Sequence, residues 1–161
     1  MMKRTLACLA AGLLAAALAG CGSTGSEADG SASGGGPVTV QNCGVEVRLE
    51  KTPSRAMIVN SAPLQYLSTL GVLDRLGSRA GKFPPEYYSK ETLEAVDKVP
   101  SLTDRLGSDG HLKISTEAII AEDPDLLLGL PEGVTRESLA AAGIPVLIEP
   151  SFCPQGIEDP G

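Results

Sequence analysis

The chain has 161 residues, of which 42% are hydrophobic and 20% are charged, and its formal net charge is −7. An acidic chain is repelled by the phosphate backbone, which excludes nucleic acid as an expected partner. Tryptophan is absent, and the chain has only three Tyr and two Phe residues, so any core must be built from aliphatic side chains. Acidic residues are scattered rather than gathered in a tail, which is typical of a solvated surface.

Residues 1–20 have the pattern of a secretory signal peptide. Lys3 and Arg4 precede an uncharged run at 6–18 that is too short to span a membrane. The run ends in the sequence Leu-Ala-Gly-Cys at 18–21, which matches the lipobox of bacterial lipoproteins. We therefore expect cleavage before Cys21 and lipidation of its thiol; the alternative is an incidental cysteine in an apolar signal.

Residues 21–36 are mainly Gly, Ser and Ala and predict a flexible tether between this anchor and a folded domain. The expected location is therefore the outer face of the cell membrane, with the lipid as the membrane contact. Residues 37–161 are enough for one core and too few for two full-sized lobes.

Alternating apolar residues on both sides of a turn at 42–44 predict a β-hairpin over 38–49. A strand over 55–59 and a helix that begins near Pro63 and ends at Gly71 follow. The later elements that we expect are strands at 76–80, 99–102, 125–129 and 144–148 and helices at 89–96, 117–121 and 136–142, the helices capped by Ser89, Ser115 and Thr135.

Strands that alternate with short helices predict an α/β fold with a parallel sheet covered on both faces. Ligands of such sheets bind beyond the carboxyl ends of the strands. The candidate site is therefore formed by the loops that follow residues 59, 80, 102, 129 and 148.

Several short segments together resemble the periplasmic binding protein family that includes siderophore and vitamin B12 binders. They are Val-Thr-Val at 38–40, Gly-Val-Glu-Val at 44–47, Arg55 to Asn60, Leu-Gly-Val-Leu-Asp-Arg at 70–75, Pro-Ser-Leu at 100–102, Glu-Ala-Ile at 117–119, Pro-Asp-Leu-Leu-Leu-Gly at 124–129 and Gly-Ile-Pro-Val at 143–146. No one of these segments is specific, and the resemblance lies in their order and spacing.

The resemblance implies two Rossmann-like lobes joined by a long helix, with ligand held between them. This sequence is expected to contain the N-terminal lobe without the C-terminal lobe, as a fragment or a truncated gene. The implied role is the substrate-binding lipoprotein of an ABC importer, which delivers a ferric siderophore to a membrane permease. Cobalamin and haem are alternative ligands, and a truncated relic or surface interaction module is the alternative function.

Five residues at positions that match the family are candidates for ligand binding: Asn60, Ser61, Lys82, Phe83 and Leu130. Tyr87 is a sixth candidate, as one of two neighbouring aromatic side chains with Tyr88. Lys82 can pair with an anionic iron chelate, and Phe83 can pack on its organic part. The alternatives are structural, because Asn60 and Ser61 suit a turn and a helix cap, and Lys82 suits a solvated loop. One of Tyr87 and Tyr88 is expected to pack inward, and the sequence does not indicate which.

Glu117 stands at the start of a predicted helix, where related binders carry an acidic residue that docks on a permease arginine. The resemblance therefore implies permease docking for Glu117. The alternative is a helix-dipole contact, which favours a carboxylate in a first turn by about 0.3–1 kcal/mol.

Cys8 lies in the signal and Cys21 is assigned to the lipid, which leaves Cys43 and Cys153. In an exported protein the simplest expectation is a disulfide between them, with two free thiols as the alternative.

No cofactor or protein-held metal is expected, because His111 is the only histidine and its loop setting is typical of an exposed side chain. An enzyme is not expected either, since the sequence has no phosphate-binding glycine loop and little from which to build a catalytic triad. Iron, if bound, would arrive already chelated.

Overall fold

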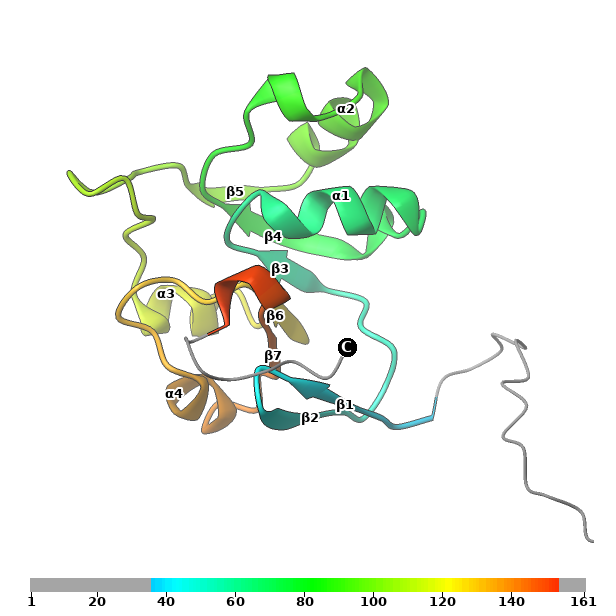
Figure 1. The fold of residues 1–161 in the computed structure, drawn as a ribbon, viewed down its shortest axis with the longest axis vertical. Helices are drawn as coiled ribbons and strands as arrows, with labels where there is room; N and C mark the ends of the chain where they lie inside the picture. Colours follow the sequence, from blue (N-terminus) through cyan, green and yellow to red (C-terminus); the bar gives the residue numbers. More distant parts are fainter. Residues whose placement is uncertain (1–35, 154–161) are drawn as a thin grey trace, which may run out of the picture. The chain divides into compact units, whose positions relative to one another are not determined.

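The computed structural model describes residues 36–153, which form an α/β unit with a separate hairpin (Figure 1). The expected signal peptide, Cys21 and most of the expected linker lie outside the described residues. In the described part of the chain, none of the helices combines the length and apolar character needed to span a membrane.

The predicted hairpin consists of β1 (Val38–Asn42) and β2 (Val45–Leu49), which pair antiparallel from Val38 opposite Leu49 to Asn42 opposite Val45. Its turn residues, Cys43 and Gly44, have φ angles of 51° and 73°. Positive φ at both central residues is the geometry of the tight turns that match strand twist in hairpins.

The main sheet has five parallel strands in the order β5-β4-β3-β6-β7. Its strands are β3 (Ala56–Ile58), β4 (Leu76–Ala80), β5 (Ser101–Thr103), β6 (Leu126–Leu128) and β7 (Val146–Leu147). The chain moves from β3 outward to β5 and then returns to the other side of β3. The strand order therefore reverses at β3, and such a switch point opens a crevice at the carboxyl ends of the neighbouring strands.

Four α-helices connect these strands, and their apolar residues cover both faces of the sheet. They are α1 (Ala62–Thr69), α2 (Lys90–Asp97), α3 (Thr116–Ala121) and α4 (Arg136–Ala140); the short 3-10 helices are η1 (Leu73–Arg75), η2 (Pro85–Tyr87) and η3 (Pro150–Phe152). The side chains of Ser89, Ser115 and Thr135 accept the predicted capping hydrogen bonds at α2, α3 and α4.

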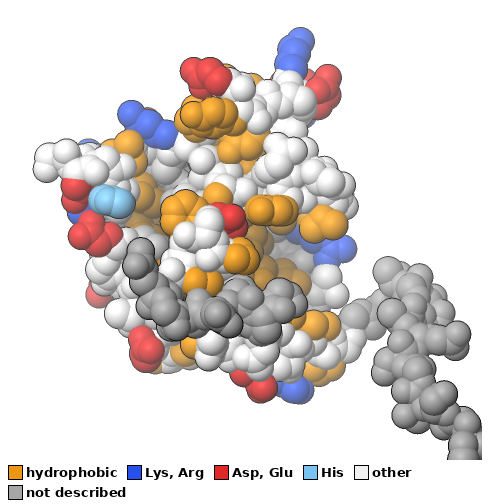
Figure 2. Space-filling view, viewed as in Figure 1, with side chains coloured by type: hydrophobic (Ala, Val, Ile, Leu, Met, Phe, Trp, Pro, Cys, Tyr) orange, Lys and Arg blue, Asp and Glu red, His pale blue; other side chains and the backbone are white. Residues whose placement is uncertain are grey.

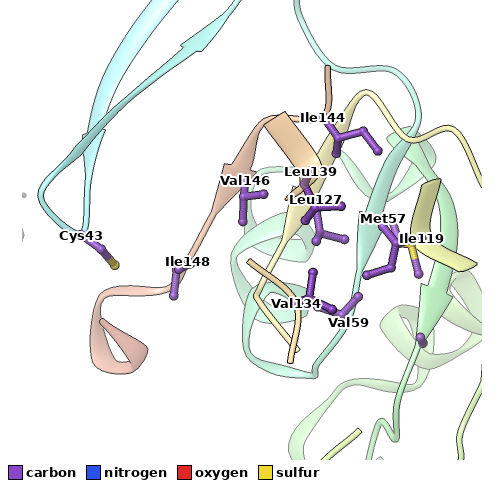
Figure 3. Packing of buried hydrophobic residues seen from close by; sticks show 11 residues of the cluster. Cys43, Met57, Val59, Ile119, Leu127, Val134, Leu139, Ile144, Val146 and Ile148 are labelled. Carbon is purple, nitrogen blue, oxygen red and sulfur yellow. The ribbon is translucent and has the colours of Figure 1, made fainter. Parts of the chain in front are cut away.

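The core divides into two clusters because successive residues of a strand point to opposite faces. Met57, Val59, Leu127 and Val146 pack with Ile119 of α3 and Leu139 of α4 (Figure 3). Ala56, Ile58 and Leu126 instead pack with Leu64 of α1 and Val96 of α2. The prediction of a parallel α/β sheet preceded by a hairpin is confirmed.

Five elements are shorter than the sequence predicts, namely β3, β5, β6, β7 and α4. β6 lacks Asp125, β7 covers only Val146–Leu147, and α4 ends at Ala140. Asp125 still donates a 3.2 Å backbone hydrogen bond to the carbonyl of Arg55, and its carboxylate oxygens accept hydrogen bonds from the backbone N–H groups of Ser54 and Arg55. Gly143 nevertheless has the predicted left-handed conformation, with φ of 75°.

Candidate functional site

A cavity of about 510 Å³ lies where the carboxyl ends of the parallel strands meet. All five loops that follow β3, β4, β5, β6 and β7 contribute residues to its wall. The lining residues are Val59, Asn60, Ser61, Gly81, Lys82, Leu106, Gly110, His111, Leu112, Gly129, Leu130, Pro131, Glu132, Ile148 and Phe152. We call this the carboxyl-edge cavity.

The centre of the cavity floor depends on glycine at position 129. Gly129 has φ of 97°, and a Cβ atom there would lie 2.5 Å from Asn60 Nδ2 and 2.9 Å from Val59 Cγ2. A side chain at this position would force the Asn60 and Val59 side chains to shift, and the positive φ is strained for other residues, so glycine favours the close approach of the loops after β3 and β6.

Asn60 combines a structural role with its place in the wall. Its Oδ1 accepts a hydrogen bond of 3.0 Å from the backbone N–H of Ala62, which turns the chain from β3 into α1. Ser61 occupies the N-cap position of α1, but its side chain makes no capping hydrogen bond. The predicted turn at Asn60 is therefore present, and the hydroxyl of Ser61 is not used as a cap.

The structure brings together four of the six candidate ligand residues. Asn60, Ser61, Lys82 and Leu130 all line the carboxyl-edge cavity, and the side chain of Lys82 is exposed. Phe83 and Tyr87 are not among the lining residues. Phe83 is half-buried against the cluster that holds α1 and α2, and the guanidinium carbon of Arg79 lies 5.5 Å from its ring centroid.

The two neighbouring tyrosines separate as expected, one inward and one outward. Tyr88 packs against the same cluster as Phe83, and its hydroxyl donates a 2.6 Å hydrogen bond to the carbonyl of Ser61. Tyr87 is 71% exposed and contacts Tyr88 edge to face at a ring distance of 6.5 Å. Tyr88 is therefore the tyrosine of the pair that packs inward, and it supports the cavity wall from behind.

Sequence reasoning named the correct loops but not all of their lining residues. His111 was expected only to be exposed; it is exposed, and it also lines the cavity. Glu132 and Phe152 line the cavity from the loops after β6 and β7. Their positions in loops that follow strands could have identified them as lining residues, because each of these loops was predicted to lie at the carboxyl edge of the sheet.

Charged groups hold one rim of the cavity together. The Nζ atom of Lys113 lies 2.8 Å from Asp109 Oδ2 and 2.7 Å from Glu132 Oε2, and so links the 104–114 loop to the loop after β6. Hydrogen bonds from Lys113 and from the backbone of His111 lower the pKa of Asp109. Asp109 is thus held as a carboxylate at neutral pH.

The remaining wall is largely apolar, formed by side chains such as Leu106, Leu112, Leu130 and Ile148. Apolar side chains also gather over the centre of the face shown in Figure 2, with charged side chains mostly around its edge. Among residues 36–153, no group of three or more His, Cys, Asp or Glu side chains is arranged to hold a metal ion. The cavity thus offers an apolar surface with a few polar donors, which suits a small organic ligand.

A second cavity, of about 420 Å³, lies at the opposite, amino-terminal edge of the sheet. Its wall includes an ion pair between Arg55 and Asp123, with a nitrogen to oxygen distance of 2.5 Å. Asp125, another lining residue, uses both carboxylate oxygens to bind the backbone at Ser54 and Arg55. These polar groups are already paired within the chain, so the carboxyl-edge cavity is the better candidate for ligand binding.

Glu117 is exposed in the first turn of α3, as the sequence predicts. Hydrogen bonds from its own backbone N–H and from the Ser115 hydroxyl lower the pKa of Glu117. A helix that follows a strand of a parallel sheet begins at the carboxyl edge. Glu117 therefore lies on the same edge of the sheet as the cavity.

Cys43 and Cys153 form a disulfide, as their positions in the chain predict. It joins the hairpin turn to the residue that follows η3. One end of the cavity wall, at Phe152, is thus one residue from the covalent link.

No protein-family model and no curated protein sequence matches the chain. Solved structures do match. A structure titled as an ABC-type Fe3+-hydroxamate transport system from Saccharomonospora viridis is 53% identical to the chain, with a TM-score of 0.71, over 74% of this chain and 41% of that one. A periplasmic binding protein from Veillonella parvula matches at 24% identity and a TM-score of 0.57, over 73% of this chain and 39% of that one, and this match supports the fold alone.

The chain spans about two fifths of the length of these structures. The names of the matched structures are those of transport and binding proteins. The Saccharomonospora viridis match confirms the predicted relationship, and its name is that of a transport system, in agreement with the prediction that the chain is not an enzyme.

Proposed function

We propose that this chain supplies one wall of a binding site for a ferric hydroxamate. It would do so as a relative of the periplasmic binding proteins of ABC-type transport, over the part of their length that it covers. The observation that carries the proposal is the carboxyl-edge cavity together with the 53% identity to the Saccharomonospora viridis structure. The sequence predicts a ferric siderophore as the ligand, and the match to this structure favours a siderophore of the hydroxamate class.

The lining of the cavity suits the chemistry of such a ligand. A ferric trihydroxamate surrounds its iron with oxygens that accept hydrogen bonds, and its linking chains are largely apolar. Lys82, Asn60 Nδ2 and the Ser61 hydroxyl are donors in the wall, and Leu130 and Ile148 supply apolar contacts. Iron enters already chelated, so the protein itself needs no metal ligands.

The cavity covers one side of a ligand, whereas enclosed sites bury about 70–90% of a ligand's surface. The two-lobed architecture expected from the resemblance would place a second lobe over the opposite side. We therefore assign to this chain the role of one wall in a substrate-binding protein, with delivery to an ABC permease as the activity of the whole protein.

Isothermal titration of the full chain with a ferric trihydroxamate tests the proposal. We expect saturable binding that the iron-free hydroxamate does not reproduce. Lys82→Gln should weaken binding about three- to tenfold, since it removes one charged donor from the wall. Lys98→Gln, at the exposed C-cap of α2, is the matched control and should bind like the wild type.

Two outcomes would contradict the ligand assignment. Tighter binding of haem or cobalamin than of the ferric trihydroxamate would move the assignment to one of the alternative ligands. Equal effects of Lys82→Gln and Lys98→Gln would remove Lys82 from the site. The same titration should be made with Phe83→Ala and Tyr87→Ala. Weaker binding by either variant would indicate that the substituted residue contacts the ligand, although neither residue lines the cavity.

Anchoring by lipid at Cys21 is part of the same proposal, and it rests on the lipobox sequence. Mass spectrometry of the chain expressed in a bacterium should find a diacylglyceryl group on Cys21 and no residues 1–20. Cys21→Ser should prevent both lipid attachment and cleavage, so that residues 1–20 remain on the chain. An unmodified Cys21 in the membrane-free fraction would contradict the anchor.

Glu117 completes the proposal as the contact with the permease. Its place on the edge that bears the cavity supports this role, because a permease must reach that edge to accept ligand. Glu117→Arg should abolish iron uptake by the whole transport protein while leaving ligand binding unchanged. Glu122→Arg, at the other end of α3, is the control and should transport normally.

A further inference from the structure

The last residue of β1, Asn42, is attached to Ile148, the residue that follows β7, although 106 residues separate them. Asn42 Nδ2 donates a 2.8 Å hydrogen bond to the carbonyl of Ile148, and the backbone N–H of Ile148 donates a 2.8 Å hydrogen bond to Asn42 Oδ1. The Asn42 side chain thus pairs with Ile148 as a neighbouring strand would. It is only 8% exposed.

Arg136, the first residue of α4, fixes the orientation of this amide. Its guanidinium donates a 2.6 Å hydrogen bond to Asn42 Oδ1 and another to the carbonyl of Val146. The same guanidinium therefore binds both the hairpin and β7. Because two donors converge on Asn42 Oδ1, the amide has one favourable orientation, in which Nδ2 faces the carbonyl of Ile148.

The next residue, Cys43, makes the second attachment. Its side chain is 3% exposed, packs in the same cluster as Ile148, and is bonded to Cys153. Figure 3 shows the Cys43 side chain directed from the hairpin turn toward the chain at Ile148. Two consecutive hairpin residues thus hold the two ends of the segment 148–153.

This segment forms one wall of the carboxyl-edge cavity, through Ile148 and Phe152. It lies beyond the last paired residue of β7, and its own backbone bonds are the local ones of η3, from Phe152 N to Glu149 O and from Cys153 N to Pro150 O. Phe152 is 62% exposed. Beyond the buried Ile148, the segment has only these local hydrogen bonds and partial packing, so its two attachment points fix the position of this wall.

We propose that the hairpin turn is the positioning element for this wall of the ligand cavity, with Asn42 fixing where the segment leaves the sheet and Cys43 fixing where it ends. The hairpin thereby acts on the ligand site without touching ligand. The part of this inference that concerns ligand rests on the proposed function. The part that concerns the wall stands on the contacts alone.

A fluorescent reporter tests the wall directly. The chain contains no Trp, so Phe152→Trp places a single tryptophan in the segment. In this background, both Cys43→Ser/Cys153→Ser and Asn42→Ala should lower the steady-state anisotropy of the reporter at temperatures below the unfolding transition. Val96→Ala is the control, because it removes packing from the opposite face of the sheet and leaves both attachments intact.

Binding of a ferric trihydroxamate to the full chain tests the link to the ligand site. Freeing the wall should weaken binding about three- to tenfold, because the ligand must then order the segment itself. Val96→Ala should not change the affinity. The disulfide-free double variant also serves if Asn42→Ala fails to fold, which far-UV circular dichroism will show.

The outcomes separate the two proposals. Unchanged anisotropy in the double variant and in Asn42→Ala would overturn the positioning role. If the variants lower the anisotropy of the reporter but leave the affinity for ferric trihydroxamate unchanged, the hairpin holds the wall in place without affecting ligand binding. If the wild-type chain binds no ferric trihydroxamate, the proposed function and the ligand part of the inference fail together, and the anisotropy alone decides the positioning of the wall.

Discussion

The hydroxyl of Tyr88 donates a 2.6 Å hydrogen bond to the backbone carbonyl of Ser61, and it joins two segments that follow different strands. Ser61 lies in the wall of the carboxyl-edge cavity, whereas Tyr88 lies behind it against the core. A residue of the wall is therefore held by a side chain that does not line the cavity.

Tyr88→Phe should lower the free energy of unfolding by about 0.5–1.5 kcal/mol, because the Ser61 carbonyl loses the shorter of its two hydrogen bonds and keeps only that from the Leu64 N–H, while the ring keeps its packing. The neighbouring Tyr87→Phe is a matched control, since Tyr87 is exposed and its variant should have wild-type stability. Urea unfolding followed by circular dichroism measures both. Equal stabilities of the two variants would show that the hydrogen bond contributes nothing.

The fold was largely predictable because its signals are local and repeat along the chain. Capping residues at Ser89, Ser115 and Thr135 marked three helix starts correctly, and runs of aliphatic residues marked the strands. Strand ends were less predictable. A buried apolar residue such as Ile144 has the same composition signal in or out of a strand, and hydrogen-bond partners decide which it is.

The candidate site was predictable as a set of loops but not as a set of side chains. Parallel topology places every loop after a strand at one edge, which brought Asn60, Lys82 and Leu130 together as expected. It does not determine which way a side chain turns within its loop. Phe83 turned toward the core because an apolar ring gains more from burial than from an open cavity wall.

Asp125 should make stability depend on acid. Its Oδ2 accepts from the Ser54 N–H at 2.8 Å and its Oδ1 from the Arg55 N–H at 2.9 Å. Partial burial acts to raise the pKa of Asp125, but these hydrogen bonds, with the charge of Lys51, outweigh it and lower the pKa. Because the folded-state pKa is depressed, the stabilisation is present above the unfolded pKa of about 3.9 and is lost as pH falls through the folded value.

Asp125→Asn should therefore cost about 1–2 kcal/mol near neutral pH, a range reduced for the solvent exposure of the group. The difference from wild type should shrink as the pH falls below about 4. Urea unfolding at several pH values measures it, with Asp74→Asn, an exposed residue of η1, as the control. A difference that stays constant with pH would show that ionised Asp125 is not the source of the stability.

Ser115 should contribute to stability through the start of α3. Its side chain accepts a 3.2 Å hydrogen bond from the Ala118 N–H, so Ser115→Ala leaves this donor without its cap and should cost about 1 kcal/mol. Ser108→Ala, in the exposed 104–114 loop, is the control. Thermal unfolding of the two variants should show a lower midpoint for Ser115→Ala alone, and equal midpoints would contradict the cap.

Lys113 should control the mobility of the loop that brings His111 to the cavity. Its contacts with Asp109 and Glu132 are exposed ion pairs, which contribute little to global stability but restrict the loop. In Lys113→Met we expect faster hydrogen exchange at the amides of Gly107 and Gly110, which bond to the carbonyls of His111 and Gly107. Added salt should speed their exchange in the wild type and change it less in the variant, because salt screens the same pairs that the substitution removes.

Lys90→Met is the matched control for this experiment. Lys90 also forms an ion pair, 3.6 Å from Glu94, but on the exposed surface of α2 and away from the cavity. Its loss should leave the loop amides unchanged. If the two variants exchange alike at Gly107 and Gly110, the Lys113 pairs do not order the loop, and the local bonds of the loop alone must hold His111 at the cavity. If only Lys113→Met exchanges faster, an ion pair between two loops sets the position of one rim of the site.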